Sequence, residues 1–321
     1  MIGRSILIAL SVLLLALLAW VRPAACGHKV IGVVFTGELP RYREAHRAFL
    51  KGMSARGFDQ GAVEYVVQVP NPDPGSWANA SRKLKAIGVN MVVAYGAPAA
   101  LAVVQEAESI PMVFVDVFGP QESTIVRLMS GDNGTITGVT SKVPLVTIIK
   151  AAQELRPIKT LGVLYNPQEV GSRVQLAELK RLAAKNGFSV REAKASTGAG
   201  LDQSLSALLK KADCLFVAES VIAGRHMERI VTRASEAGVP VLSSIPGASD
   251  KGALVTLEVS PAEQGQLAAE HAARILAGAH PGRLQVQTPR QIDLIVNLKT
   301  AKTLDIQVPF QVLSMATRIV K

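Results

Sequence analysis

Short apolar runs alternate with amphipathic segments along most of this 321-residue chain, and no other feature constrains its fold as strongly. The first run is KVIGVVF (29–35), and the tenth is GALVTLEV (252–259). Most of these runs are separated by segments with helical spacing of apolar residues, such as Val174, Leu179 and Leu182. Strand, helix and strand in repeated order predict an α/β protein with parallel sheets and right-handed crossovers.

The two halves of the chain carry similar segments, which predicts two lobes of the same kind. The stretches QEAESIPMVFVDV near residue 110 and TRASEAGVPVLSSI near residue 240 both lead from a helix end through a turn and a proline into a strand. A chain of this length suits two domains that each bury a core. Two α/β lobes with a cleft between them are the simplest interpretation. Aromatic residues make up only 4%, which disfavours a β-sandwich or a nucleic-acid reader with stacking aromatics.

The last part of the chain adds a long helix and a further strand-like segment. The helix (260–282) begins at Ser260-Pro261-Ala262-Glu263, which is typical of a capped helix start. The final segment is RQIDLIVNLKTAKTLDIQVP (290–309). If the helix returns to the first lobe and this segment to the second, the chain crosses between lobes three times and forms a hinge. We expect the first crossing at LRPIKT (155–160), where Pro157 interrupts a helix.

Residues 1–26 have the pattern of a secretory signal: Arg4 precedes an apolar stretch over 5–21, and Arg22, Pro23 and small residues follow it. A retained membrane anchor is the alternative, because the stretch is near the lower length limit for spanning a bilayer. Cys26 follows two alanines as in bacterial lipoprotein cleavage sites, whereas Pro23 departs from that pattern, so lipidation of Cys26 stays open. We expect a protein in the periplasm or anchored on the extracytoplasmic side of the membrane.

The charge pattern does not indicate a nucleic-acid partner. The net charge is +10, but the basic residues are spread over helix-like segments such as SRKLKAIG and ELKRLAAKNG. Solvated helix faces explain this distribution better than a binding groove does. An exported protein also has little access to nucleic acid.

The chain lacks the motifs of common catalytic and cofactor sites. It contains no G-x-S-x-G elbow, no P-loop and no G-x-G-x-x-G, and none of its five histidines pairs with another at metal-ligand spacing. Cys214 lies in the apolar run ADCLFVAES and is expected to be a small buried side chain without a disulfide. Asp116, Glu219 and Glu258 lie near strand ends but far apart in the sequence. We therefore predict a protein that is not an enzyme and has no cofactor and no metal.

The residues at the predicted strand ends instead suit the binding of a small polar molecule with a flat or apolar part. Hydroxyls, amides, one acid and aromatic rings converge there. A Glu219 at a strand end is suited to an ammonium group or to solute hydroxyls, with a simple surface position as the alternative. The candidates at these ends are Thr36, Tyr95, Gly96, Ala97, Phe118, Thr140, Asn166, Glu219 and Ser244.

The segments GVLYNP (162–167) and NLKTAKTL (297–304), with their order and spacing, resemble a known family. The chain is similar to the periplasmic solute-binding proteins of bacterial ABC transporters, in the branch that includes tryptophan- and tyrosine-binding members. The resemblance runs from about Lys29 to the end. It implies a type I binding-protein fold with two Rossmann-like lobes, three crossover segments and a ligand cleft. The implied lobes are 28–157 plus 252–283 and 158–248 plus 285–321.

The resemblance also implies ligand contacts, with departures at informative positions. It adds Ser172 to the candidates, as a second-lobe residue beside Asn166. Where relatives often read Thr-Asp-Asn, this chain reads Glu219-Ser220-Val221, and where they often read Asp-Glu-Gly it reads Ser244-Ile245-Pro246. Gly96-Ala97 offers mainly backbone amides. An α-amino acid would place its carboxylate at the Gly96 turn and its amine at Glu219.

These features predict an exported, monomeric binding protein that captures a small solute by hinge closure and presents it to an ABC permease in the inner membrane. The membrane is contacted only through the signal or a lipid anchor. The alternative is a sensor subunit with the same two lobes that acts with a membrane receptor kinase. A transcription regulator of this fold is opposed by the signal segment and by the absence of a helix-turn-helix motif before the first strand. A hydrolase would lack a nucleophile and a base.

Overall fold

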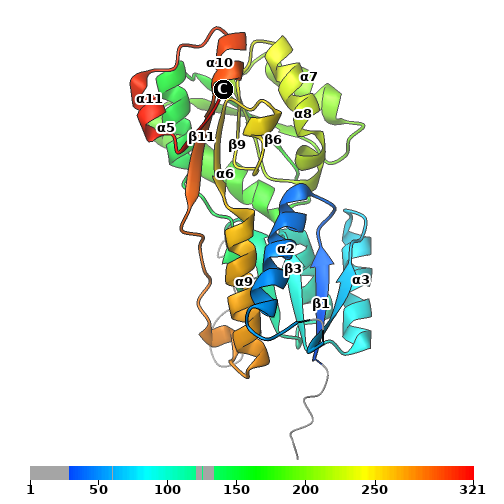
Figure 1. Cartoon of the computed structure of the whole chain (residues 1–321). Helices are drawn as coiled ribbons and strands as arrows, with labels where there is room; N and C mark the ends of the chain where they lie inside the picture. Colours follow the sequence, from blue (N-terminus) through cyan, green and yellow to red (C-terminus); the bar gives the residue numbers. More distant parts are fainter. Residues whose placement is uncertain (1–28, 60, 121–124, 126–133) are drawn as a thin grey trace, which may run out of the picture.

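Two α/β lobes form the described part of the chain, as the alternation of strands and helices predicts (Figure 1). This computed structural model describes residues 29–59, 61–120, 125 and 134–321. The predicted signal (1–26), including Cys26, lies outside the described residues. Within the described ranges, none of the helices combines the length and the apolar character that crossing a membrane requires.

Lobe 1 is built on a sheet of five parallel strands. Its elements are β1 (Lys29–Phe35), α2 (Pro40–Ser54), β2 (Val63–Gln68), α3 (Pro74–Ile87), β3 (Met91–Tyr95), α4 (Ala97–Glu106), β4 (Met112–Val117), β5 (Ile136–Thr140) and α9 (Pro261–Leu276). The strand order is β2-β1-β3-β4-β5. The inner strands are buried on both faces because α2 and α9 cover one face while α3 and α4 cover the other.

Lobe 2 is built on a larger sheet of mixed direction. Its elements are α5 (Leu145–Leu155), β6 (Thr160–Tyr165), α6 (Val170–Asn186), β7 (Ser189–Lys194), α7 (Leu201–Leu209), β8 (Cys214–Val217), α8 (Val221–Glu236), β9 (Val241–Ser243), β10 (Val255–Val259), β11 (Ile292–Asn297), α10 (Leu298–Thr303), α11 (Phe310–Met315) and β12 (Arg318–Val320). The strand order is β12-β11-β10-β9-β8-β6-β7, and only the pairing of β10 with β11 is antiparallel. Helices α5 and α6 cover one face, and α7 and α8 cover the other.

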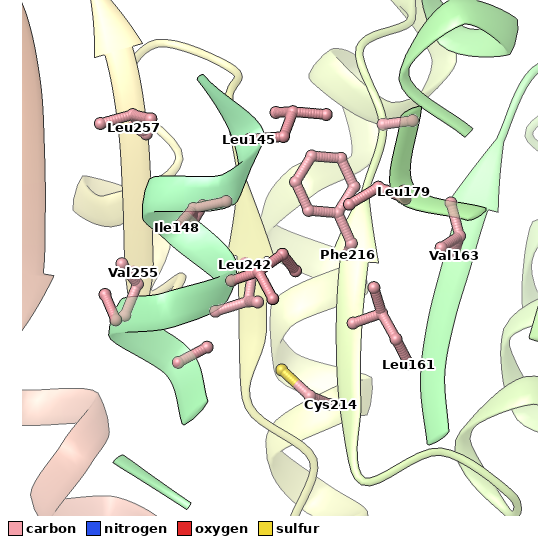
Figure 2. Packing of buried hydrophobic residues seen from close by; sticks show 14 of the residues in the cluster. Leu145, Ile148, Leu161, Val163, Leu179, Cys214, Phe216, Leu242, Val255 and Leu257 are labelled. Atoms are coloured by element: carbon pink, nitrogen blue, oxygen red, sulfur yellow. The ribbon is translucent and has the colours of Figure 1, made fainter. Parts of the chain in front are cut away.

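The first crossing between the lobes lies before α5, at residues 141–144, and not at 155–160 as predicted. The reason is that the apolar face of α5 packs on the sheet of lobe 2. Leu145 and Ile148 belong to the same buried cluster as Leu242 of β9 and Leu257 of β10, which Figure 2 shows side by side. Amphipathic spacing identifies the buried face of a helix but does not say which sheet covers it.

The second crossing lies at Ser260, so the predicted return to lobe 1 at residue 252 is also wrong. Strand β10 pairs in parallel with β9 of lobe 2, through Val255 with Leu242. The Ser260 hydroxyl accepts a hydrogen bond from Glu263 N at 3.2 Å, and this cap starts α9, which then packs on lobe 1. The third crossing follows Gln287, whose carbonyl still accepts from Thr140 N of lobe 1.

Helices α2 and α9 pack with their backbones unusually close together (Figure 1). A Cβ atom at Gly265 of α9 would overlap the carbonyl oxygen of Ala45 in α2. A Cβ atom at Gly52 would lie 2.7 Å from the Cβ atom of Ala269. The small residues of the two helices therefore bring α9 onto lobe 1 after the chain has visited lobe 2.

Cys214 is confirmed as a free, buried thiol on β8. Burial raises the pKa of this thiol to about 12. It packs with Leu161 and Phe216 in the core of lobe 2 (Figure 2). Cys214 is thus a core side chain.

Candidate functional site

The two lobes touch each other where the strands of both sheets end. In lobe 1 the loop between β1 and α2 meets the start of α8 in lobe 2. A Cβ atom at Gly37 would lie 3.0 Å from Val221 Cγ1, and a Cβ atom at Gly224 would lie 3.0 Å from Leu39 Cδ2. In open α/β sheets, ligands bind at such carboxyl ends. The structure therefore describes the lobes in contact at the edge where a ligand site is expected.

A cluster of buried charges lies at this contact. Arg41, in the first turn of α2, donates from Nε to Oδ2 of Asp116 at the end of β4, at 2.7 Å. Its Nη2 lies 3.6 Å from Oε1 of Glu219, which follows β8 in the other lobe. The side chains of Arg41 and Asp116 are only 4% and 3% exposed, and that of Glu219 is 11% exposed. One guanidinium thus joins a carboxylate from each lobe.

The backbone at Asp116 is held in an uncommon conformation. Asp116 has φ +58°, in the left-handed region that few residues other than glycine adopt. The pairing of β4 with β5 shifts register between Val115 and Val117, on either side of it. Such strain persists when surrounding contacts hold it, and it is frequent at functional sites. Here the hydrogen bond from Arg41 holds the Asp116 carboxylate toward α2.

A hydrogen-bond network in lobe 2 brings together residues predicted from the sequence. Asn166 donates from its backbone N to Ser172 Oγ at 2.9 Å and from Nδ2 to Glu169 Oε1 at 2.8 Å. The Glu169 carboxylate in turn accepts from the backbone N of Val221, at the start of α8. Asn166 and Ser172 therefore lie together, and both are buried and satisfied by their neighbours.

Gln175 of α6 connects the two other predicted residues of lobe 2. Its Nε2 donates to Ser244 Oγ at 2.8 Å, and its Oε1 accepts from the backbone N of Glu219 at 2.8 Å. The amide of Gln175 is fully buried. It fixes the backbone of Glu219 and so leaves the carboxylate of Glu219 to face lobe 1.

The predicted residues of lobe 1 surround the start of α4. Thr36 donates from Oγ1 to the carbonyl of Tyr95 at 2.8 Å and accepts from Ala99 N at 3.2 Å. Gly96 has φ +88°, and a side chain there would overlap the hydroxyl of Tyr42. Gly96 N donates to the carbonyl of Val115, and Ala100 N donates to the carbonyl of Gly96. Ala99 N is bonded to Thr36. In the described part of the chain, Ala97 N is therefore the one N–H of this first turn without an acceptor.

The predicted residue Thr140 lies at the first crossing. Its hydroxyl donates to the carbonyl of Val117 at 2.9 Å and accepts from Lys142 N at 3.0 Å. These bonds fix the end of β5 where the chain leaves lobe 1. Thr140 is 6% exposed, and its hydroxyl already has partners within the chain.

Two predicted aromatic contacts belong to the cores instead. Tyr95 is fully buried, stacks on Phe35 at 4.6 Å between ring centroids, and places its hydroxyl 3.1 Å from Nδ1 of His46. Phe118 is 1% exposed and packs within the core of lobe 2. Both rings are therefore covered by protein in this arrangement of the lobes.

Sequence reasoning missed Arg41, Glu169 and Gln175. A signal existed for Gln175, because Ser172, Gln175 and Leu179 recur at intervals of three and four residues and so share the buried face of α6. Arg41 stands in the first turn of α2, where the helix dipole disfavours a cation. An arginine at this unfavourable position in the helix indicates that acidic partners lie nearby.

Burial raises the pKa of two acids of lobe 2 at this contact, Glu219 and Glu169. The pKa of Glu219 lies well above its ordinary value because of burial and of the nearby Asp116 carboxylate, while the Arg41 guanidinium opposes this shift. Burial likewise raises the pKa of Glu169 to about 7, against the hydrogen bonds from Val221 and Asn166. Both carboxyl groups therefore take up a proton more readily in the closed arrangement than in water.

We expect the stability of the chain to fall with rising pH partly through Glu169. Its pKa is raised on folding, so the stabilisation is complete below about pH 4.5 and is lost as the pH rises through about 7. Glu169→Gln keeps one acceptor oxygen, which can serve both Asn166 Nδ2 and Val221 N as Oε1 of Glu169 does, but it cannot ionise. Between pH 5 and pH 8 its melting temperature should fall by about 3 °C less than that of the native chain. Circular dichroism melting measures this difference.

The control for that measurement is Glu44→Gln, which removes a carboxylate from the exposed face of α2. It should melt with the pH dependence of the native chain. An identical pH dependence in Glu169→Gln and the native chain would contradict the role given to Glu169.

Comparisons with known proteins agree with this fold. The family model for ABC transporter substrate binding proteins matches residues 30–320. A tyrosine-binding protein of Clostridioides difficile is 27% identical over 281 residues, which cover 87% of this chain and 81% of that protein. The crystal structure of a conserved domain protein from Vibrio cholerae has a TM-score of 0.85 and 28% identity, and covers 91% of this chain and 99% of that one.

Two further structures differ in how closely they match. An ABC domain from Streptococcus pneumoniae in complex with L-Trp has a TM-score of 0.86 at 22% identity and covers 92% of this chain and 100% of its own. The ligand-free, open structure of a substrate-binding protein from Clostridium difficile has a TM-score of 0.68 at 26% identity, with 91% and 99% covered. This chain belongs to the family of ABC transporter substrate-binding proteins. These proteins are not enzymes, and the fold is the type I periplasmic binding-protein fold.

Proposed function

We propose that this chain captures a small solute carrying a protonated amine between its lobes and delivers it to an ABC permease. The observation that carries the proposal is the buried cluster of Asp116, Arg41 and Glu219, which joins the two lobes. It holds two carboxylates for one guanidinium, and Glu219 is the less tightly paired acid. Burying such a charge without a partner is costly, so the cluster favours a ligand that brings a cation.

An α-amino acid fits the surroundings of this cluster. The Gly96 turn at the start of α4 offers the N–H of Ala97 to a carboxylate, as helix starts do. The Tyr42 hydroxyl links the two subsites, because it lies against Gly96 and accepts from Arg41 Nη2 at 3.1 Å. The carboxylate of the solute then lies at the start of α4 and its amine at Glu219. The tyrosine-binding relative and the L-Trp complex of similar fold support this ligand class.

Capture works by closure of the two lobes. A solute that touches Ala97 in lobe 1 and Glu219 in lobe 2 makes both contacts only when the lobes meet, so its binding shifts the population toward the closed form. Three crossing segments form the hinge. The higher similarity to the L-Trp complex than to the open, ligand-free structure supports a closed arrangement here. We place the exported, monomeric chain in the periplasm or on the extracytoplasmic face of the membrane.

A thermal-shift screen with matched solutes tests this function. The exported protein is heated with amino acids, with their N-acetyl derivatives and with uncharged sugars. At a concentration 100 times the dissociation constant, a solute adds about 2.7 kcal/mol to the stability, which corresponds to a shift of several degrees. We expect at least one free amino acid or related amine to raise the melting temperature, and its N-acetyl derivative to have no effect. Shifts by sugars alone would argue against the proposed ligand class.

A further inference from the structure

The first turn of α9 holds a segment that lies far along the chain. Ser260 caps this helix, and Glu263 stands where the acid of a capping box commonly turns back to its own helix start. The carboxylate of Glu263 turns to the third crossing instead. Its Oε1 accepts from Arg290 N at 2.9 Å, and its Oε2 accepts from Gln291 N at 3.2 Å. One carboxylate thus holds two successive N–H groups of the third crossing.

These bonds lie next to the place where two crossings enter lobe 2. Val259, the last residue of β10, pairs with Ile292, the first residue of β11. Between this pair and the bonds of Glu263, the second crossing has only Ser260, and the third crossing passes directly from Gln291 to Ile292. Figure 1 shows the third crossing running beside α9 before β11 begins. Both crossings therefore pass between the lobes at the same level.

The neighbouring residue connects α9 to the first crossing as well. Gln264 is 1% exposed, and its Nε2 donates to the carbonyl oxygen of Thr140 at 3.4 Å. The backbone N of Thr140 in turn donates to the carbonyl of Gln287, where the third crossing begins. The start of α9 is thus the point at which the three crossings meet.

We propose that Glu263 is a positioning residue of the hinge, which holds the third crossing to α9 so that the second and third crossings bend at one level. This inference rests on the lobe movement proposed above. Hydrogen bonds to a charged acceptor are stronger than those between neutral groups, so this short exposed segment resists local opening. With these bonds the lobes rotate about a fixed line. Without them the bending spreads over residues 288–291, and the lobes gain freedom to twist.

Hydrogen exchange of the dialysed, solute-free chain tests the hydrogen bonds of Glu263. Mass spectrometry follows the peptides that cover residues 288–292. In Glu263→Ala, the amides of Arg290 and Gln291 should exchange about tenfold faster than in the native chain, or more. The amides over 263–266 should keep their native exchange, because Ser260 still caps the helix. Faster exchange at 263–266 alone would mean that Glu263 serves only its own helix, and would overturn the proposal.

The twisting of the lobes is measured by pulsed electron paramagnetic resonance. Spin labels are attached through unnatural amino acids in place of Lys83 in lobe 1 and Lys210 in lobe 2, which are both exposed. Glu263→Ala should broaden the distribution of distances between the labels roughly twofold or more. A native distribution in this variant would overturn the role of Glu263 in positioning the lobes.

Glu270→Gln is the matched control, because Glu270 lies about two turns further along α9. It should behave as the native chain does in both measurements. If circular dichroism shows that Glu263→Ala does not fold, Glu263→Gln decides the question. It keeps one acceptor oxygen and should speed the exchange of one of the two amides, whereas native exchange of both overturns the proposal. No solute is present in these experiments, so their outcome is separate from that of the solute screen.

Discussion

Gly265→Ala is expected to destabilise the chain by about 3 kcal/mol or more, the upper part of the range for overpacked cores. A Cβ atom at this position would overlap the carbonyl oxygen of Ala45, which belongs to the backbone of α2 and cannot rotate away. The helices would have to separate, and the buried contacts of Phe49 and Ala269 between them would loosen. Because α9 returns the chain to lobe 1, the crossing at Ser260 would be disturbed as well. Urea unfolding measures the loss.

Gly75→Ala is the matched control for this substitution. Gly75 lies in the first turn of α3 and is exposed, and a Cβ atom there would meet only the Asp73 side chain, at 3.4 Å. Alanine at this position should leave the stability unchanged or raise it by up to about 1 kcal/mol, because it favours the helix. Equal stability of Gly265→Ala and the native chain would mean that α2 and α9 are farther apart than described.

Glu219→Gln is expected to weaken the binding of the amine-bearing solute by roughly 10-fold to 150-fold. Hydrogen bonds to charged groups contribute about 1.5–3 kcal/mol, and the substitution removes the charge while keeping the size and one acceptor oxygen. The backbone of Glu219 stays in place because its N–H bonds to Gln175. Since burial raises the pKa of this carboxyl, a neutral amide should change the unfolding free energy by no more than about 1 kcal/mol. Isothermal titration calorimetry gives the affinity.

The control for the binding measurement is Glu228→Gln, which removes a carboxylate from the exposed face of α8. This variant should bind the solute with native affinity. If Glu219→Gln also binds with native affinity, then the amine of the solute lies elsewhere in the protein.

Much of the fold could be predicted because its signals are local. Each of the ten apolar runs forms a strand, and the capped helix after Ser260 begins where expected. The lobe boundaries could not be predicted, because the sequence patterns of α5 and β10 are compatible with packing in either lobe. Only the packing of Ile148 against Val255 and the pairing of Val255 with Leu242 show that both belong to lobe 2. The antiparallel direction of β11 likewise depends on how the chain returns from lobe 1.

The candidate site could be predicted where it depends on strand ends. Asn166, Glu219 and Ser244 follow buried strands, and the structure connects them through hydrogen bonds. Tyr95 is the last residue of β3, yet its ring turns into the core, since side-chain direction depends on the register within the sheet. Arg41 could not be recognised from its neighbours in the sequence, because its partners lie 75 residues away and in the other lobe.

Native mass spectrometry of the protein, purified from the extracytoplasmic fraction without denaturation, shows directly whether the chain carries an amine-bearing solute. We expect one small molecule with an amine bound per chain when the native protein is isolated, and we expect Glu219→Gln to lose it. Glu228→Gln should retain it. The claim would be contradicted by a bound molecule that lacks an amine, or by a native chain that carries no solute and takes up none when amino acids and related amines are added.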